Sequence, residues 1–463
     1  MNDRRPAREV QVLVVGAGPA GLTAAATLAR YGVSTLLVDR RAEVGAAPRA
    51  TVISLRSMEI FRAMGLEAEL RGGSVDVEML AWRCRTLAEV GNGEASDVGF
   101  PSRGRAARLS PTTPLCAPQD HLERVLSRYV GALAPVEVRR GVELVDLEVG
   151  PDGVDARLSD STQVHARYLI AADGAHSTVR SMLDIGMTGP PTELTGFTVV
   201  MRAPLWDRIG PHRYLIYSVG APGAEGVFIP AGPADRWVYA AETTAPDSEA
   251  AALERIRVAA GDASLSAEIH GIHRVTAVSQ LAERFRHDSA FLVGDAAHRV
   301  TPRGATGMNT AVHDGFDLGW KLGWVLAGWA PPHLLDTYEA ERRPVAEHNV
   351  ARSADPTGSW RSAEQELRAD LGGRLPHARL RDGRSTLDLL GPGLTILRRR
   401  APGRPPPRTP DSAAMITRLV DEKASRAIGL DENGVIVRPD GKYVRTARAA
   451  RIRHTAQSDA AVR

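Results

Sequence analysis

The feature that most constrains this chain is a glycine-rich turn near its N-terminus. Val10 to Val15 is an apolar run that predicts a strand, and Ala20 to Tyr31 has the pattern of a helix. Between them, Gly16, Gly18 and Gly21 follow the spacing G-x-G-x-x-G. The first glycine permits a tight turn, the second lets a pyrophosphate approach the backbone, and the third lets the helix pack on the strand. We therefore expect an α/β, Rossmann-like domain that binds a dinucleotide.

An acidic residue completes this pattern. Thr35 to Val38 predicts a second strand, and Asp39 stands at its end, about 20 residues beyond the first glycine. A carboxylate at this place accepts hydrogen bonds from the hydroxyls of a ribose. The free N–H groups and the dipole of the helix after the turn favour the anionic pyrophosphate. The alternative is a glycine turn in another kind of α/β domain, and the motif alone does not distinguish FAD from NAD.

Length and composition limit the class of protein. The chain has 463 residues, enough for two or three domains, and its hydrophobic fraction of 43% and charged fraction of 24% are those of globular proteins. The net charge is +3 and both signs are spread along the chain, so we expect no nucleic-acid partner. Cys84 and Cys116 form neither a CxxC pair nor a metal-ligand set. We therefore expect no bound metal, and two cysteines without a disulfide framework fit the reducing cytoplasm. No apolar run is long enough to span a membrane, so we expect no membrane partner. The protein is expected to be a monomer or homodimer.

The middle of the chain has the pattern of an antiparallel sheet. The stretches Phe197 to Met201, Tyr214 to Val219 and Trp237 to Ala241 alternate apolar with polar residues, and glycine and proline clusters separate them. A helical pattern follows from Ser248 to Val258. These elements predict a distinct α+β unit, and we expect the substrate to bind there.

Two residues of this unit are candidates for substrate binding. They are Tyr217, in the second of these stretches, and Arg213, directly before it. With Tyr214 and His212 beside them, such side chains have the chemistry to orient a phenolate. Alternating strands also place polar residues outward without any functional role, and that alternative stays open.

Two later segments each bring an acidic residue to the end of an apolar run. Leu169 to Arg180 reads LIAADGAHSTVR, so a strand ends at the pair Asp173-Gly174. Phe291 to Asn309 reads FLVGDAAHRVTPRGATGMN, so another strand ends at Gly294-Asp295. A loop rich in glycine and proline then leads into a helix.

Together with the glycine turn, these segments resemble the three fingerprints of the flavoprotein monooxygenases related to para-hydroxybenzoate hydroxylase and to the phenol and polyketide hydroxylases. Their order and separation also match. The resemblance covers roughly residues 9 to 350 and is greatest to enzymes that hydroxylate aromatic polyketides. It implies non-covalent FAD as the cofactor and NADH or NADPH as the co-substrate. Since the chain has a single dinucleotide fingerprint, the nicotinamide is expected to visit transiently.

The resemblance also implies which residues meet FAD. Asp295 would hydrogen-bond the ribityl chain, and the backbone near Gly307 and Met308 would meet the isoalloxazine ring at a helix N-terminus. Donors placed there stabilise negative charge on a reduced flavin. Arg49 and Gln119 match family residues that touch the cofactor. The expected cofactor-binding residues are Gly16, Gly18, Pro19, Ala20, Gly21, Asp39, Arg40, Arg49, Gln119, Asp173, Gly294, Asp295, Pro302, Gly307, Met308 and Asn309.

By this resemblance the protein is an FAD-dependent monooxygenase of secondary metabolism. It would consume NAD(P)H and O2 and hydroxylate an aromatic, phenolic or polyketide, substrate through a flavin C4a-hydroperoxide. The oxygen chemistry belongs to the cofactor, so no triad or metal cluster is required, and we assign no catalytic residue. Two alternatives stay open: a Baeyer–Villiger-type oxygenation of a polyketide on the same fold, and a flavin reductase or binder that does not oxygenate.

The same resemblance divides the chain into domains. Residues 1–71, 104–180 and 277–355 are expected to form a discontinuous FAD-binding domain, which includes a β-meander from Leu144 to Ile170. The substrate-binding region is expected to comprise residues 72–103 and 181–276.

The C-terminal part of the chain departs from the family pattern. Residues 356–463 are expected to be an extension that holds at most a shortened thioredoxin-like domain, since it has no cysteine. Its pattern predicts a helix from Ala413 to Ile428 and a hairpin around Asn433-Gly434 and Asp440-Gly441. A second departure is Asp317, which stands where family members often have asparagine, and we expect FAD binding to persist.

Other chemically suggestive residues have ordinary structural explanations. His298 stands beside a strand end, where histidine more often packs and hydrogen-bonds than acts as an acid or base. Phe316, Trp320 and Trp324 recur at helical spacing and predict a buried face.

Overall fold

The first unit of the fold is built on a parallel sheet around the glycine turn. The computed structural model describes residues 8–190, 193–400, 413–431 and 434–444. β1 (Arg8–Val15), α1 (Pro19–Ala29) and β2 (Thr35–Asp39) follow one another, which confirms the predicted strand, turn, helix and strand. The sheet order is β18-β19-β10-β1-β2-β7, with parallel central strands. Its other strands are β7 (Val136–Arg140), β10 (Gln163–Ala171), β18 (Arg286–His287) and β19 (Ala290–Leu292).

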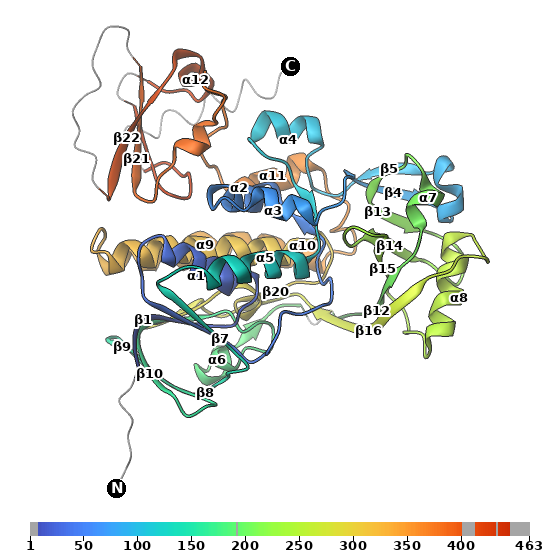
Figure 1. The fold of residues 1–463 in the computed structure, drawn as a ribbon, viewed down its shortest axis with the longest axis horizontal. Helices are drawn as coiled ribbons and strands as arrows, with labels where there is room; N and C mark the ends of the chain where they lie inside the picture. The colour runs from blue at the N-terminus through green and yellow to red at the C-terminus, as the bar shows by residue number, and fades with distance from the viewer. Residues whose placement is uncertain (1–7, 191–192, 401–412, 432–433, 445–463) are drawn as a thin grey trace.

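Helices lie over one side of this sheet and a meander flanks it (Figure 1). α1, α5 (Gln119–Gly131) and α9 (Gly307–Leu326) form the helical layer, and α10 (Thr337–Ala354) packs on α9. β8 (Leu144–Gly150) pairs antiparallel with β9 (Gly153–Leu158), and β9 pairs with β10, which confirms the predicted β-meander. The central strands are therefore covered on both faces, as parallel strands require.

α9 packs close to α1 because glycines line its contact face. A Cβ added at Gly315 would overlap the carbonyl of Ala20, and one at Gly319 would lie 2.8 Å from the Cβ of Thr27. Gly323 approaches an aromatic ring just beyond α1 in the same way. Residues at i, i+4 and i+8 share one face of a helix, so the three glycines let the two backbones meet.

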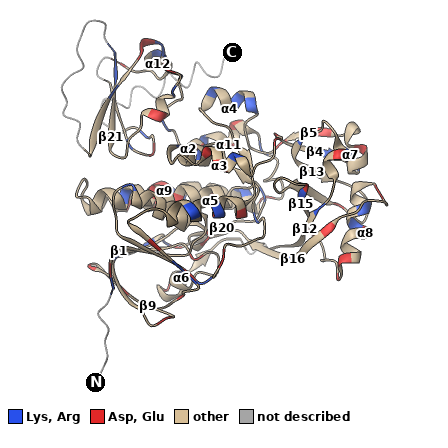
Figure 2. Cartoon of the chain, viewed as in Figure 1, with Lys and Arg blue, Asp and Glu red and all other residues tan. Residues whose placement is uncertain are grey.

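The predicted apolar face of α9 is confirmed. Phe316, Trp320 and Trp324 are all buried in the core of the first unit. Trp320 and Trp324 make an edge-to-face contact with their ring centres 5.0 Å apart. In the part of the chain that the structure describes, no helix is long and apolar enough to cross a membrane. Basic and acidic residues are interspersed over the elements of the fold (Figure 2).

The second unit is a seven-stranded sheet with the order β16-β12-β15-β14-β13-β4-β5. The three stretches predicted to alternate form β12, β13 and β15, and the predicted helix is α8 (Glu249–Ala260). The antiparallel sheet predicted for this stretch is confirmed, since β12, β15, β14 and β13 pair antiparallel in that order. β4, from an earlier part of the chain, joins β13 in parallel. A strand from a distant part of the chain joins in either direction, whereas strands linked by a tight hairpin are antiparallel. The strands are β4 (Glu78–Cys84), β5 (Glu94–Asp97), β12 (Glu193–Arg202), β13 (Tyr214–Val219), β14 (Gly226–Pro230), β15 (Arg236–Ala241) and β16 (Glu268–Val278).

The two faces of this second sheet have different neighbours. Tyr217, Phe228 and Tyr239 share a core with α8, which lies on the side away from the first unit (Figure 1). Side chains alternate along a strand. Ile216 therefore points the other way, and it packs against the same apolar cluster as Ala305 of the first unit.

The C-terminal region forms a small sheet of its own. β21 (Leu394–Arg399) pairs in parallel with β22 (Met415–Val420) and antiparallel with β23 (Val435–Val437). The predicted helix from Ala413 to Ile428 is wrong over its first half, and only α12 (Glu422–Ala427) is helical. A short apolar run is compatible with a helix or a strand, and Met415–Val420 is a strand because it pairs with β21.

The predicted hairpin turn at Asp440-Gly441 is confirmed. The N–H of Arg438 donates to the carbonyl of Lys442 at 2.8 Å, and Val437 and Tyr443 form an antiparallel bridge. The other predicted turn includes Asn433, which lies outside the described residues. The thioredoxin-like character of this region stays a prediction.

An ion-pair network attaches the C-terminal region to α9 and α10. Asp317 on α9 lies 2.6 Å from Lys321, and Glu341 on α10 lies 2.6 Å from Arg438 and 3.1 Å from Lys442. Lys321 also lies 3.6 Å from Glu341, which joins the pairs. The aspartate that departs from the family pattern thus supplies the charge that balances a fully buried lysine.

Short elements complete the described fold. They are β3 (Val52–Ile53), α2 (Leu55–Ala63), α3 (Glu67–Gly72), α4 (Arg103–Leu109), β6 (Leu115–Cys116), α6 (Thr178–Met182), β11 (Met187–Thr188), α7 (Leu205–Ile209), β17 (Gln280–Ala282), β20 (His298–Arg299), α11 (Ala363–Leu371) and the 3-10 turns η1 (Leu87–Asn92), η2 (Gly294–Ala296), η3 (Pro332–Asp336) and η4 (Thr386–Leu389).

Candidate functional site

The glycine turn between β1 and α1 is shaped by close backbone contacts. Gly16 has a φ of +108°, and a Cβ added there would overlap the carbonyl of Ala172, just after β10. A Cβ added at Gly21 would overlap the carbonyl of Gly16, so glycine is what lets α1 pack on the turn. At Gly18, in contrast, an added Cβ meets no atom within 4 Å. The backbone of Gly18 is therefore open to a ligand, as the pyrophosphate role requires.

Asp39, at the end of β2, braces this turn. Its carboxylate accepts hydrogen bonds from the N–H of Ala17 at 2.7 Å and from the N–H of Arg41 at 2.8 Å. Burial by itself would raise the pKa of Asp39, but the hydrogen bonds and the charge of Arg41 lower it. The carboxylate is therefore ionised at neutral pH, and its bond to a ribose stays a prediction.

The turn Gly294-Asp295 lies where α1 and α9 meet. Gly294 has a φ of +60°, and an added Cβ would lie 3.0 Å from the Cβ of Ala311 on α9 and 3.2 Å from that of Ala20 on α1. Asp295 is exposed, yet protein atoms crowd its carboxyl closely enough to raise its pKa. The charges of His298 and Arg49 oppose this rise.

A buried carboxylate on α9 holds this turn in place. Asp314 is 0% exposed and accepts hydrogen bonds from the N–H of Gly294 at 3.1 Å, from Nε2 of His298 at 2.6 Å and from Nε of Arg342 at 2.7 Å. Burial by itself would raise the pKa of Asp314, but the charges and hydrogen bonds of Arg342 and His298 lower it to about 2. His298 is itself fully buried, so its predicted packing and hydrogen-bonding role is confirmed.

Asp173 orders the segment that follows the second fingerprint, and Arg180 of that segment connects it to the third. Its carboxylate accepts hydrogen bonds from Oγ of Ser177 at 2.6 Å and from the N–H of Val179 at 3.1 Å, and so caps α6. Burial raises the pKa of Asp173 against these bonds. Arg180, on the same helix, donates to the carbonyl of Ala296 at 3.1 Å. The two turns that end β10 and β19 are thereby tied together.

The start of α9 is held by the side chain of Asn309, which is 4% exposed. Its oxygen accepts two hydrogen bonds and its amide donates two, so the orientation of the amide is defined. The partners are the N–H of Ser54, Oγ of Ser57 and the carbonyls of Val52 and Ala305, at 2.8, 2.9, 3.0 and 3.1 Å. With its side chain engaged, Asn309 contributes only backbone to a ligand, together with Gly307 and Met308.

The other expected cofactor residues lie around these turns. Gln119 begins α5 and donates to Glu123 at 2.7 Å. Burial raises the pKa of Glu123 as it does that of Asp295, and the charge of Arg49 opposes both rises. Their contacts with FAD stay predictions. The remaining positions are Pro19 and Ala20 in the first turn of α1, Arg40 exposed after β2, and Pro302 exposed on the loop before α9.

The two substrate candidates are occupied by contacts within the second unit. Tyr217 is fully buried on the α8 side of the sheet, where its hydroxyl donates to the carbonyl of His212 at 2.6 Å and accepts from the N–H of Tyr214 at 2.9 Å. The guanidinium of Arg213 lies over the ring of Trp206 at 4.5 Å. The structure does not bring Tyr217 toward the first unit, because strand alternation points it to the opposite face.

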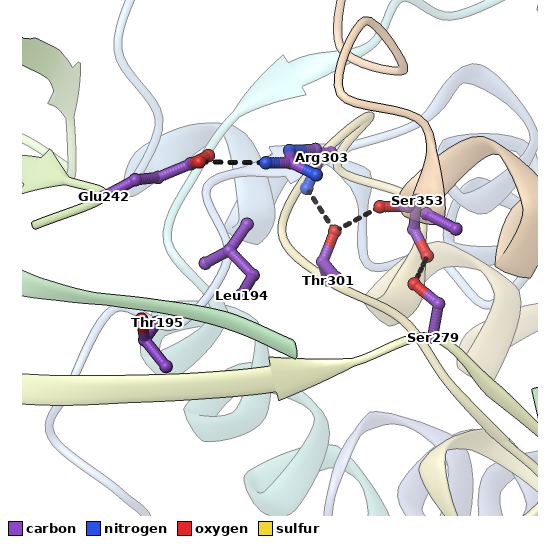
Figure 3. Close-up of a pocket in the computed structure, with 8 residues that line it drawn as sticks. Leu194, Thr195, Glu242, Ser279, Thr301, Arg303 and Ser353 are labelled. Atoms are coloured by element: carbon purple, nitrogen blue, oxygen red, sulfur yellow. Dashed lines mark hydrogen bonds and ion pairs between the residues drawn. The ribbon is translucent and has the colours of Figure 1, made fainter. Parts of the chain in front are cut away.

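A cavity of about 230 Å³ lies between the two units (Figure 3). Arg303, on the loop before α9, donates to Glu242 at the end of β15 at 2.8 Å and so links the units. Thr301 and Ser353 also line the cavity, and Oγ1 of Thr301 donates to the carbonyl of Ser353 at 2.7 Å. Because Thr301 and Arg303 flank Pro302, the cavity adjoins the loop that the resemblance places at the flavin ring. The lining residues are Leu194, Thr195, Glu242, Ser279, Thr301, Arg303, Ser353 and Ala354.

Comparison with known proteins identifies the family. The family model described as FAD binding domain matches residues 9–353. A 2,4-dichlorophenol 6-monooxygenase from Cupriavidus pinatubonensis is 34% identical over 448 residues, which cover 92% of this chain and 71% of that protein. The chain belongs to the FAD-dependent aromatic monooxygenases.

Further relatives of this monooxygenase support the same family assignment. A Streptomyces halstedii protein assigned as a polyketide hydroxylase is 36% identical over 359 residues, 74% of this chain. This chain spans 64% of the length of that relative. The solved structure of aklavinone-11 hydroxylase with FAD and aklavinone matches with a TM-score of 0.81 and 27% identity, covering 95% of both chains. The predicted fold class and the predicted FAD cofactor are confirmed.

The described residues of the monooxygenase fit FAD. The open backbone at Gly18 suits a pyrophosphate, and the carboxylates of Asp39 and Asp295 suit hydroxyl groups. The first N–H groups of α9 have no partner within the helix and suit negative charge on a reduced ring. When bound, FAD supplies the redox and oxygen chemistry of the site.

The sequence interpretation named Asp317 only as a departure from the family pattern and did not assign a role to Asp314 or Lys321, although a signal was present. Asp314, Asp317 and Lys321 are charged residues within a helix that is otherwise mostly apolar. Buried charges persist when they are paired, so charges inside an apolar helix predict ion-pair partners. The signal does not name Arg342 or His298 as those partners, because they come from other segments.

Proposed function

We propose that this monooxygenase inserts one oxygen atom of O2 into an aromatic, phenolic or polyketide, substrate, with NADH or NADPH as the reductant. The observation that carries the proposal is that the loop before α9 meets the second sheet, with a cavity between the two units. The relatives support this substrate class, since one is named for 2,4-dichlorophenol and another binds aklavinone.

The proposed substrate surface is the face of the second sheet that lies toward the first unit. This face is largely apolar, and several of its residues remain half-buried. A partly accessible apolar surface suits a flat aromatic ring system. Its main residues are Val200, Ile216, Val227, Ile229, Val238 and Ala240, which alternate with the residues packed under α8.

We propose that the Arg303–Glu242 pair orients a polar group of the substrate. An arginine side chain has five N–H donors, and the bond to Glu242 uses one of them. The pair lies at the cavity wall (Figure 3), and Arg303 follows Pro302 on the loop before α9, so a phenolic oxygen that bonds to Arg303 is placed next to that loop. The apolar face covers the rest of the ring system and excludes water.

We place the protein in the cytoplasm, as a monomer or homodimer, also as a proposal. Cys84 and Cys116 are both free thiols. Burial raises the pKa of Cys84 to about 11 and that of Cys116 to about 12, so neither forms much thiolate at neutral pH. Free thiols are the usual state in a reducing compartment.

The test measures NAD(P)H oxidation by the purified holoenzyme with and without a panel of phenols and aromatic polyketides. We expect a substrate that stimulates oxidation and a product that carries one atom of labelled O2 on a ring carbon. Label within a new ester would instead indicate a Baeyer–Villiger reaction. Stimulation by no member of the panel would favour a flavin protein that does not oxygenate.

A further inference from the structure

A segment that follows the FAD-binding domain match returns to the start of α9. The match ends at residue 353, and α11 lies beyond it. α11 begins with a capping box, in which Ser362 and Gln365 exchange hydrogen bonds through side chain and backbone, so its start is well defined. Residues 358–371 are termed the brace segment.

The far end of the brace segment caps α2. Oδ1 of Asp370 accepts a hydrogen bond from Oγ of Ser54 at 2.7 Å, and Oδ2 accepts one from the N–H of Arg56 at 3.2 Å. Ser54 is the N-cap residue of α2, and the first N–H groups of a helix favour a carboxylate. Asp370 therefore fixes the first turn of α2 from outside the matched domain.

The first turn of α2 in turn orients Asn309. The N–H of Ser54 and Oγ of Ser57 both donate to Oδ1 of Asn309. Nε2 of His313, one turn along α9, lies 3.1 Å from Oγ of Ser57. Burial lowers the pKa of His313 well below its usual value, so the ring is neutral and can donate to the Ser57 hydroxyl. His313 then donates to Ser57, and Ser57 donates to Asn309, so the three side chains form one hydrogen-bonded chain.

The near end of the brace segment contacts the loop before α9 and the second sheet. Oγ of Ser359 accepts a hydrogen bond from the N–H of Gly304 at 3.3 Å. Trp360 and Ala305 pack against one apolar cluster, and the ring of Trp360 lies 4.5 Å from the guanidinium of Arg83 on β4. The segment thus contacts the loop at one end and α2 at the other, on either side of the first turn of α9.

We propose that the brace segment positions the start of α9 against the flavin ring, with Asp370 as the positioning residue. Without Asp370, the hydroxyl of Ser54 and the N–H of Arg56 lose their acceptor, and the contact that orients Asn309 loosens. The first N–H groups of α9 then align less well with the ring, where they stabilise negative charge on the reduced flavin. The inference goes beyond the proposed reaction and rests on FAD binding alone.

The test compares Asp370→Ala with Asp370→Asn and with Glu364→Gln. Glu364 shares α11 with Asp370, but its 2.6 Å pair with Arg105 lies at the surface, so it is the matched control. For each protein, the FAD dissociation constant of the apoprotein, the flavin midpoint potential and the thermal midpoint are measured. We expect Asp370→Ala to bind FAD about tenfold more weakly, with a more negative potential. Asp370→Asn keeps an acceptor for Ser54 and should lie between wild type and Asp370→Ala, and Glu364→Gln should match wild type.

The inference is overturned if a folded Asp370→Ala protein has the flavin potential and FAD affinity of wild type. It is also overturned if Glu364→Gln changes these two quantities as much as Asp370→Ala does. If Asp370→Ala does not fold, Ser54→Ala decides, since it removes the hydroxyl bonded to Asp370 but keeps the N–H bonded to Asn309. A more negative potential in Ser54→Ala supports the inference, and an unchanged potential overturns it. No measurement includes a substrate, so failure of the proposed hydroxylation leaves these outcomes unaffected.

Discussion

The two halves of α9 are held in place by different kinds of contact. From Gly307 to Asp314 the helix is held by hydrogen bonds and ion pairs, with the side chains of Asn309 and Asp314 at their centre. From Gly315 onward its contact with α1 is made by closely packed glycines and buried aromatic rings, and the Asp317–Lys321 pair faces α10 and the C-terminal region. The first half adjoins the expected flavin ring, and the second half runs through the core.

The difference has a physical reason. Close packing acts at short range but without direction, so it fixes the distance between two helices. Hydrogen bonds depend on angle, so they fix the rotation of a helix and the direction of its end groups. The glycine-packed half therefore sets where α9 lies, and the polar half aims its first N–H groups.

The largest expected effect comes from Gly315→Val in the packed half. The added Cβ overlaps the carbonyl of Ala20, and that backbone cannot move without separating α9 from α1. We expect a loss of stability above the roughly 1–3 kcal/mol usual for overpacking, together with loss of bound FAD. Thermal unfolding and the flavin absorbance of the purified protein measure both effects.

The matched control for this change is Gly131→Ala. Gly131 is also a helical glycine, at the end of α5, but an added Cβ there meets no atom within 4 Å. We expect it to be neutral or slightly stabilising, because alanine favours a helix more than glycine does. If Gly315→Val were as stable as Gly131→Ala, the comparison between the two halves would fail.

The next largest effect is expected for Asp314→Asn in the polar half. The change leaves Arg342 buried without its counter-charge, which typically costs about 3–5 kcal/mol. Because the pKa of Asp314, about 2, lies below its ordinary value of 3.8, its stabilisation is present above that value and is lost as the pH falls toward 2. Urea unfolding of both proteins from about pH 7 to pH 3 should show a stability difference that narrows below about pH 4. A constant difference would show that ionisation of Asp314 is not its source.

A smaller effect is expected for Asn309→Ala. The change removes four hydrogen bonds but leaves no unpaired charge, so we expect a loss of about 1–3 kcal/mol. FAD affinity should fall as well, because the first turn of α9 loses its orientation. The control is Asn349→Ala, whose amide donates to Oγ1 of Thr310 at 2.8 Å from α10. It should lose stability without losing FAD affinity, and an equal fall in both variants would contradict the assignment.

The smallest effect is expected for Tyr217→Phe in the second sheet, where packing dominates as it does in the second half of α9. The lost hydroxyl bonds only to backbone, so we expect a cost of about 1 kcal/mol and unchanged kcat and KM for a stimulating substrate. Tyr239→Phe, on the same face, should also leave kcat and KM unchanged. Its hydroxyl donates to the carbonyl of Ala224 at 2.8 Å and accepts from Nε of Arg255 at 3.2 Å, both within the second unit. A raised KM for Tyr217→Phe alone would return this residue to the substrate site.

The parts of the fold that could be predicted have local signals. The glycine spacing from Gly16 to Gly21, with strands and a helix on either side, depends on residues close together in sequence, and the structure has those elements. The β-meander before Asp173 and the buried face of Phe316 and Trp320 are of the same kind. In each, apolar side chains recur every two residues, as in a strand, or about every 3.6 residues, as in a helix. Such a period is visible in a short stretch of sequence.

The parts that were wrong or missed depend on partners distant in sequence. Met415 to Val420 forms a strand because β21 offers it an edge, and β4 joins β13 in parallel because a long connection separates them. Tyr217 points to α8 because of the register of its strand, which a list of polar residues does not reveal. No pattern around Asp314 or Asp370 names the groups that they bind.

By itself, the sequence determined the dinucleotide turn, the two later turns at Asp173 and Asp295, and through their resemblance the FAD cofactor. Turn geometry and the need for glycine are set within a few residues, so they can be read along the chain. Only the tertiary structure decided which face of the second sheet meets the cavity, which charges balance inside α9, and that Asp370 reaches α2. Those outcomes depend on burial, since a buried charge or hydrogen-bonding group needs a partner that the fold alone brings near.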